Sequence, residues 1–153
     1  MRDYAISPYV GALPLTFDQT PEEVGRVIGA PQSTWMEPSS RIIETRDGVN
    51  IGYLADEKTI FEIVVDQDDR EIVNVWLNDM NLMRAENLVE TLLLLDSEPQ
   101  LSVGFIYFFA LGISVADFPN LDDSSLSIHV FRRGLHDSAS SRFIPYDQSN
   151  GPM

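Results

Sequence analysis

Carboxylates are the most abundant chemically active side chains in this 153-residue chain, which contains 24 Asp and Glu residues and no cysteine. One acidic run, Asp66–Glu71, begins like a calcium-binding loop. Its later positions do not fit, because Glu71 stands where such a loop needs glycine and Leu77 stands where it needs glutamate. We therefore interpret the run as a polar hairpin turn and predict no metal site.

Nucleophilic and acid–base chemistry has equally weak support. His129 and His136 have no carboxylate at a recognised metal-ligand spacing, and the serines of 138–141 are not part of a Gly-x-Ser-x-Gly elbow. None of the nine glycines forms a phosphate-binding loop before a helix. We therefore expect a non-enzyme without cofactors. A metal-assisted hydrolase using clustered carboxylates is the alternative, and a structural or assembly adaptor is a third hypothesis.

Net charge gives a clearer signal, because 10 Lys and Arg against 24 Asp and Glu leave −14 at pH 7. A field of this sign repels nucleic acid and anionic membranes and speeds encounter with a basic partner. No apolar run approaches the roughly 20 residues that cross a bilayer, and the first residues lack the apolar core of a signal peptide. We expect a cytoplasmic protein with no nucleic-acid or membrane partner.

The first expected element is a short helix over 20–28. Thr20 suits the N-cap, Pro21 the first helical position, and Glu23 completes a capping box. Gly29 is placed to end the helix. Apolar residues of this helix should pack on a sheet, because so short a helix is unstable alone. The expected packing face is Val24, Val27 and Ile28.

An antiparallel meander is expected next. Asp47-Gly48 is a strong hairpin signal between strands at 41–46 and 49–54. Alternating apolar residues predict further strands at 59–66 and 71–77. A short edge strand is expected at 9–13, and 32–40 is expected to be a loop containing Trp35.

The second half is expected to repeat the order of helix and then strands. Leucines at helical spacing predict a helix over 84–95, and strands follow at 103–111, 113–116 and 125–132, the first of them central. The predicted fold class is α+β, an antiparallel meander with short helices on one face. We expect one domain over 1–153, with two pseudo-repeats (about 8–77 and 78–134) and a loose tail at 135–153.

Two parts of the sequence resemble known families. The opening combines Gly11–Leu15, Asp18–Val24 and Ile28–Pro31, and resembles the helix-plus-meander unit of β-lactamase-inhibitor-protein and outer-membrane-assembly (BamE-like) domains. It also resembles bacterial toxin-immunity and uncharacterised proteins, whose closing strands are similar to Leu111–Val115 and Ile128–Gly134. In these families the pattern builds the fold rather than a catalytic centre. The resemblance implies a protein that binds and blocks another protein.

The leading hypothesis is therefore a non-catalytic acidic binding protein, most specifically an immunity protein that neutralises a basic toxin such as a nuclease. Acidic side chains would steer the toxin, and tryptophans would anchor the contact. The candidate contact residues are Asp66, Asp68, Asp69, Asp117, Asp122, Asp123, Trp35 and Trp76.

Overall fold

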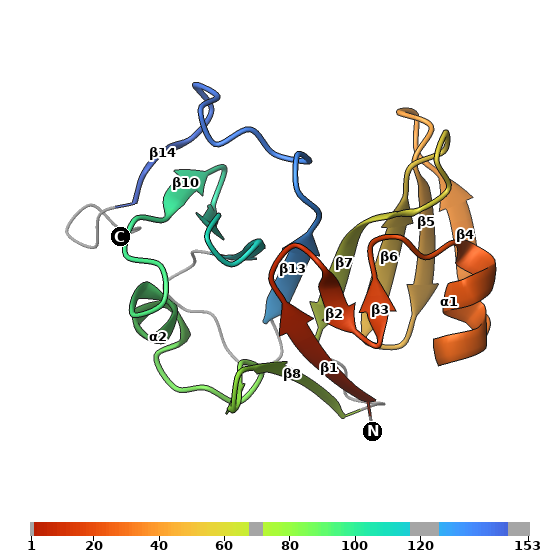
Figure 1. The fold of residues 1–153 in the computed structure, drawn as a ribbon, viewed down its shortest axis with the longest axis horizontal. Helices are drawn as coiled ribbons and strands as arrows, with labels where there is room; N and C mark the ends of the chain where they lie inside the picture. The colour runs from red at the N-terminus through yellow and green to blue at the C-terminus, as the bar shows by residue number, and fades with distance from the viewer. Residues whose placement is uncertain (1, 68–71, 117–125, 147–153) are drawn as a thin grey trace.

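Two β-sheets make up most of the computed structural model, which describes residues 2–67, 72–116 and 126–146. Within these residues the large sheet has the strand order β14-β10-β11-β12-β13-β7-β6-β5-β4 (Figure 1). In that order its strands are Ile144–Pro145, Gln100–Ser102, Phe105–Phe108, Ile113–Ala116, Ser127–Phe131, Ile60–Asp66, Val49–Tyr53, Ile42–Arg46 and Ser33–Met36. The small sheet has the order β3-β2-β1-β8-β9, with strands Leu15–Thr16, Gly11–Leu13, Arg2–Ser7, Val73–Leu77 and Met80–Asn81.

Pairing is antiparallel throughout these sheets except between β1 and β8, which run parallel. With only two short helices in the described residues, the fold is α+β and mainly β, which confirms the coarse prediction. The expected succession of two helix-then-strands units is not confirmed. Strand β13, from the second half, pairs directly with β7 from the first half, so both halves contribute neighbouring strands to one sheet.

The predicted four-strand meander is wrong at its last member. Asp47-Gly48 does join β5 to β6, and β7 follows β6 as expected. The next strand, β8, leaves this sheet and pairs with β1 and β9 in the small sheet. The predicted edge strand at 9–13 is also corrected, because β2 lies between β1 and β3. Local alternation identified these strands but not their neighbours.

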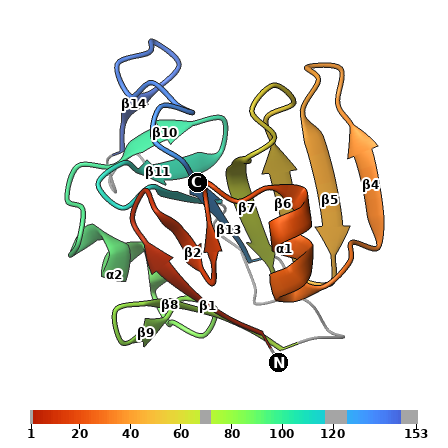
Figure 2. The same ribbon diagram turned by 45° about the vertical axis from the view of Figure 1, so that its right-hand side comes forward.

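The main core lies between the two sheets, where the small sheet crosses one face of the large one (Figures 1 and 2). In the central strands every second residue faces this core, as the pleat of a strand requires. The fully buried members from the large sheet include Ile51, Ile63, Val65, Ile106, Ile113, Ile128 and Val130. Tyr4, Val73 and Val75 are core members from the small sheet.

Helix α1 (Pro21–Ile28) forms where the capping signals predict it. The Thr20 hydroxyl accepts a bond from the Glu23 N–H, and the Glu23 carboxylate accepts one from the Thr20 N–H. Gly29 ends the helix at a φ of 89°. The predicted packing face is corrected: Val24 is 0% exposed, whereas Val27 is 45% exposed. The helix lies against the sheet through a narrower stripe than its apolar residues suggest.

The second half departs further from prediction. Helix α2 covers only Leu88–Leu93, because Asn87 has a left-handed backbone (φ 53°) that prevents an earlier start. The predicted central strand over 103–111 is present only as β11, which lies between β10 and β12, and its predicted start is a turn. Strands β10 and β11 meet at Val103-Gly104, where both residues have positive φ and Val103 is 90% exposed. The predicted strands at 113–116 and 125–132 are present as β12 and β13.

Candidate functional site

Two acidic segments of the sequence, 66–71 and 117–123, connect to strands at one end of the large sheet. Strand β7 ends at Asp66 beside the start of β13, and the Gln67 N–H donates to the Leu126 carbonyl at 3.1 Å. The Asp66 N–H donates to the carbonyl of Gly48 at 2.9 Å, so the β5–β6 turn lies at the same end. The Asp66 carboxylate accepts a bond from Asn50 at 3.3 Å. We call this region the acidic end of the large sheet.

The sequence that continues from this end is strongly acidic. Ranges 66–71 and 117–123 together contain seven Asp and Glu residues and one Arg. Five of the predicted contact residues fall outside the described residues: Asp68, Asp69, Asp117, Asp122 and Asp123. Their described neighbours Gln67 and Leu126 are hydrogen-bonded to one another. The fold therefore brings the flanks of two distant acidic segments together, which sequence alone did not reveal.

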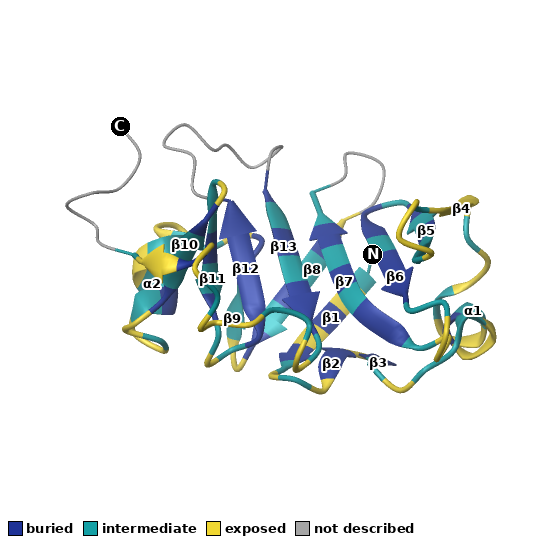
Figure 3. Ribbon diagram, turned by 90° about the horizontal axis from the view of Figure 1, so that it is seen from above, coloured by how far each residue is buried: buried dark blue, intermediate teal, exposed yellow. Residues whose placement is uncertain are grey.

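Trp35 lies on strand β4, at the edge of the large sheet, rather than in the expected loop. Trp35 is 48% exposed and Met36 is 64% exposed, so neither is buried in the core. Figure 3 shows β4 and α1 as the exposed elements at this side of the molecule. Trp35 retains the exposure that an interface anchor requires.

Trp76 has a different environment from Trp35. It lies on β8 of the small sheet, is half-buried, and its Nε1–H donates to the Asp3 carboxylate at 3.2 Å. Bonds from Asn74 and Trp76 lower the pKa of Asp3. The two tryptophans therefore lie on different sheets, and the structure does not bring them together.

A buried hydrogen-bond network connects the end of helix α1 to the large sheet. Arg46 donates from Nε and Nη2 to the Gly29 carbonyl at 3.0 and 2.8 Å, and from Nη1 to Glu44 at 3.0 Å. The Tyr53 hydroxyl donates to the same Glu44 oxygen at 2.8 Å. Burial, together with Glu44, raises the pKa of Tyr53 well above its ordinary value. These buried polar groups are hydrogen-bonded to one another, so we assign this network a structural role.

An aromatic group on the opposite face of the large sheet was not predicted. Phe131 is buried but lies outside the main core cluster, in edge contact with Tyr9, Phe109 and His136. Residues 133–146, which we call the C-terminal segment, contribute His136 and the buried Phe143 to this group. The segment ends with β14 paired to β10. Of the predicted tail, the described part thus packs on the sheet through Phe143.

Basic residues surround this aromatic group. Arg41, Arg132, Arg133 and Arg142, which we call the arginine cluster, line two adjacent cavities of about 300 and 270 Å³. Burial and the neighbouring Arg142 lower the pKa of His136, whereas burial raises the pKa of Tyr107. One signal was available in the sequence: residues 132–142 hold three Arg, one His and a single acid. Arg41 is distant in sequence and had no such signal.

Within the described ranges no group of three or more His, Asp or Glu is arranged to hold a metal ion. No helix of the described chain has the length and apolarity to span a membrane. No protein-family model, curated protein or solved structure matches the chain.

Proposed function

We propose that this chain is a non-catalytic acidic protein that binds a basic protein partner at the acidic end of the large sheet. The observation that carries the proposal is the hydrogen bond between Gln67 and Leu126, with Asp66 bound to the β5–β6 turn beside it. It joins the flanks of two segments that together contain seven acids and one Arg. We expect acids from distant sequence positions to act together on an approaching partner.

Charge supplies the attraction in this proposal, and exposed apolar side chains supply the short-range contact. At net charge −14 the chain attracts a basic protein from a distance and accelerates association. Rim charges contribute mainly to the association rate, while buried aromatic anchors control dissociation. Trp35, exposed on the edge strand β4, is the anchor we propose. Trp76 is a weaker candidate because its ring nitrogen already bonds to Asp3.

The most specific form of the proposal is a cytoplasmic immunity protein that neutralises a basic toxin by direct binding. The family resemblance of the sequence and its acidity support this form.

The experiment compares partner capture by wild type and by the double variant Asp122→Lys/Asp123→Lys. Proteins retained by wild type from the source cells are identified by mass spectrometry, purified and tested in equilibrium binding. We expect a basic partner whose affinity for the double variant is at least tenfold lower. If the captured protein binds both forms equally well, the acidic end is not the binding surface. The immunity form further requires that co-expression of this chain relieves growth arrest by that partner.

A further inference from the structure

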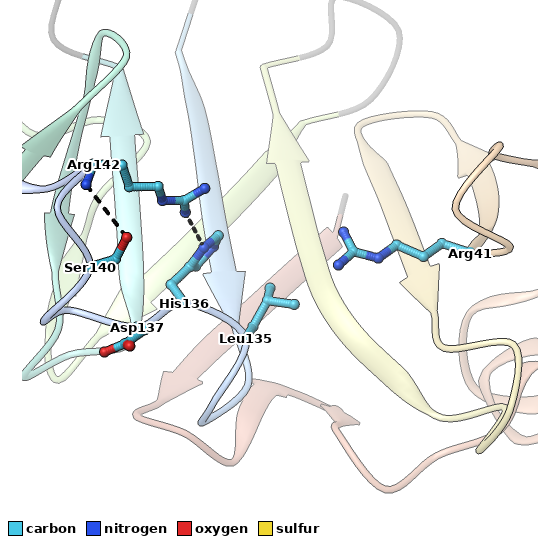
Figure 4. Close-up of a pocket in the computed structure, with 6 residues that line it drawn as sticks. All are labelled: Arg41, Leu135, His136, Asp137, Ser140 and Arg142. Atoms are coloured by element: carbon cyan, nitrogen blue, oxygen red, sulfur yellow. Dashed lines mark hydrogen bonds between the residues drawn. The ribbon is translucent and has the colours of Figure 1, made fainter.

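The arginine cluster concentrates positive charge in an acidic molecule. Four of the ten Lys and Arg residues of the chain line its two cavities. The first cavity, of about 300 Å³, is lined by Arg41, Leu135, His136, Asp137, Ser140 and Arg142 (Figure 4). The second, of about 270 Å³, shares Arg41 and Leu135 and adds an apolar wall of Leu54 and Phe61. Two cavities with common walls suit one ligand that spans both.

Aromatic rings hold the guanidinium groups in place. Arg41 lies 4.7 Å from the centre of the Phe61 ring, Arg142 lies 4.6 Å from that of Phe143, and Arg133 lies 4.1 Å from that of Tyr9. A guanidinium stacked on a ring keeps its N–H groups available at its edges. Figure 4 shows Arg41 and Arg142 extending toward each other from opposite sides of β7 and β13. Their free donors therefore converge on the space between them.

Most guanidinium groups of the arginine cluster have no carboxylate partner among the described residues. Among the described residues Arg41, Arg133 and Arg142 form no ion pair, whereas Arg132 pairs with Glu57 at 3.0 Å. Asp137 lines the first cavity, but its carboxylate accepts a bond from the Ala139 N–H and is drawn pointing away from both guanidinium groups (Figure 4). Converging cations without a counter-charge repel one another, and a bound anion removes that cost.

Neutral polar groups complete the first cavity. His136 accepts a bond at Nδ1 from Arg142 at 2.7 Å, and burial with the adjacent Arg142 lowers its pKa, so the ring is neutral. The Ser140 hydroxyl oxygen accepts a bond from the backbone N–H of Arg142 at 3.4 Å. Its own O–H has no acceptor among the described residues and is available to a ligand. The cavity thus offers charged and neutral donors together, with one acid turned aside.

We propose that the arginine cluster binds a phosphate monoester, with the phosphoryl group between Arg41 and Arg142 and its organic group against Leu54 and Phe61. A phosphate monoester carries a charge near −2 at pH 7, which balances two guanidinium groups. Its oxygens match the guanidinium fork in bidentate geometry. An organic group of modest size fills an apolar-walled cavity and fixes the orientation of the ligand. This site is separate from the acidic end and requires no protein partner.

The test titrates the whole chain with phenyl phosphate and follows backbone amide shifts by NMR. We expect saturable binding to wild type, with the shifts centred on residues 41, 61 and 135–142. Arg142→Gln and Arg41→Gln should each weaken binding at least tenfold. Arg26→Gln is the matched control, because it removes the same charge from an exposed pair on α1, and it should stay within twofold of wild type. Equal losses in all three variants would overturn the proposal.

Further ligands and one conservative variant sharpen the result. Inorganic phosphate should bind more weakly than phenyl phosphate, and equal affinities would overturn a ligand that spans both cavities. Benzoate, a monoanion with the same ring, should also bind more weakly, and equal binding would overturn the choice of a dianion. Arg142→Lys keeps the charge but loses the fork, so an intermediate affinity is expected. Melting temperatures show whether each variant is folded. If Arg142→Gln is unfolded, the affinity of Arg142→Lys for phenyl phosphate tests the proposal instead.

Discussion

Two regions of the large sheet, its acidic end and the arginine cluster on one face, differ in how charged groups are held. At the acidic end, charged segments continue from strand ends whose backbones are joined by hydrogen bonds between residues 66 and 48 and between 67 and 126. In the arginine cluster, the guanidinium groups of Arg41, Arg133 and Arg142 are stacked on aromatic rings. Backbone bonds place a segment, whereas ring contacts place an individual side chain.

The two proposals assign different kinds of recognition to these two regions. A field spread over many acids acts at long range, weakens as salt screens it, and affects mainly the rate of encounter. Converging guanidinium groups act at hydrogen-bond distance and select the shape and charge of a small anion. If the two regions differ in this way, substitutions in each should have distinct effects.

The first prediction concerns the large sheet that carries both regions. Arg46→Met should lower the free energy of unfolding by about 3–5 kcal/mol, because it leaves the Glu44 carboxylate and the Gly29 carbonyl without their buried partner. The matched control is Arg26→Met, which breaks an exposed i,i+4 pair and should cost less than about 0.5 kcal/mol. Urea unfolding of both variants measures the difference. Similar midpoints would mean that the buried network does not support the sheet.

The second prediction concerns steering at the acidic end. Asp122→Lys/Asp123→Lys should lower the association rate constant of the basic partner about tenfold at low ionic strength, an effect that shrinks as salt screens the field. The control is Arg132→Gln/Arg133→Gln in the arginine cluster, where the same rate should not fall. Stopped-flow mixing at several salt concentrations gives these values. If the association rate constant changes neither with salt nor with the acid reversal, the acidity serves solubility and not steering.

The third prediction distinguishes structural acids from those that steer. In α1 the Glu23 carboxylate is committed to the capping box with Thr20. Thr20→Ala should therefore cost about 1 kcal/mol of stability and leave partner association unchanged. Thr34→Ala, in the exposed edge strand β4, is the control and should cost less. Chemical denaturation tests the stability, and an association rate that fell with Thr20→Ala would place α1 in the interface.

The smallest expected effect is the titration of His136. Burial and Arg142 lower its pKa, so the folded chain binds its proton less readily than the unfolded chain, whose histidine pKa is about 6.5. The contribution of this histidine to stability is complete above that pH and declines as pH falls through it. NMR of the imidazole should give a midpoint below about 6.5 in native protein and near 6.5 in urea. Equal midpoints would remove the argument that His136 is neutral.

Local signals predicted the elements whose determinants are adjacent in sequence. The capping box of α1 and the Asp47-Gly48 turn each depend on a few neighbouring residues, and both are present. The β10–β11 hairpin was missed because its turn contains Val103, a β-branched residue at a φ of 49°, inside an apolar run. Apolar residues normally indicate burial, and here one of them forms an exposed turn.

Sites assembled from distant residues were beyond prediction for a different reason. The pairing of β7 with β13 joins strands about 60 residues apart, and no periodicity specifies a partner at that distance. The same pairing places Asp66 beside Ser127. Likewise, Arg41 shares a cavity with Arg142 only because the C-terminal segment packs over the sheet. The candidate acids were identified as residue types, and their grouping depended on topology.

The position of β13 between β7 and β12 also has a consequence for synthesis on the ribosome. Until residues 127–131 have emerged, β7 has one edge without its final partner, although β6 is already available on the other. That edge belongs to a strand with Ile63 and Val65, and an open apolar edge pairs readily with other chains. A nascent or truncated chain that ends before β13 is therefore expected to aggregate, and pairing of β13 with β7 covers this open edge.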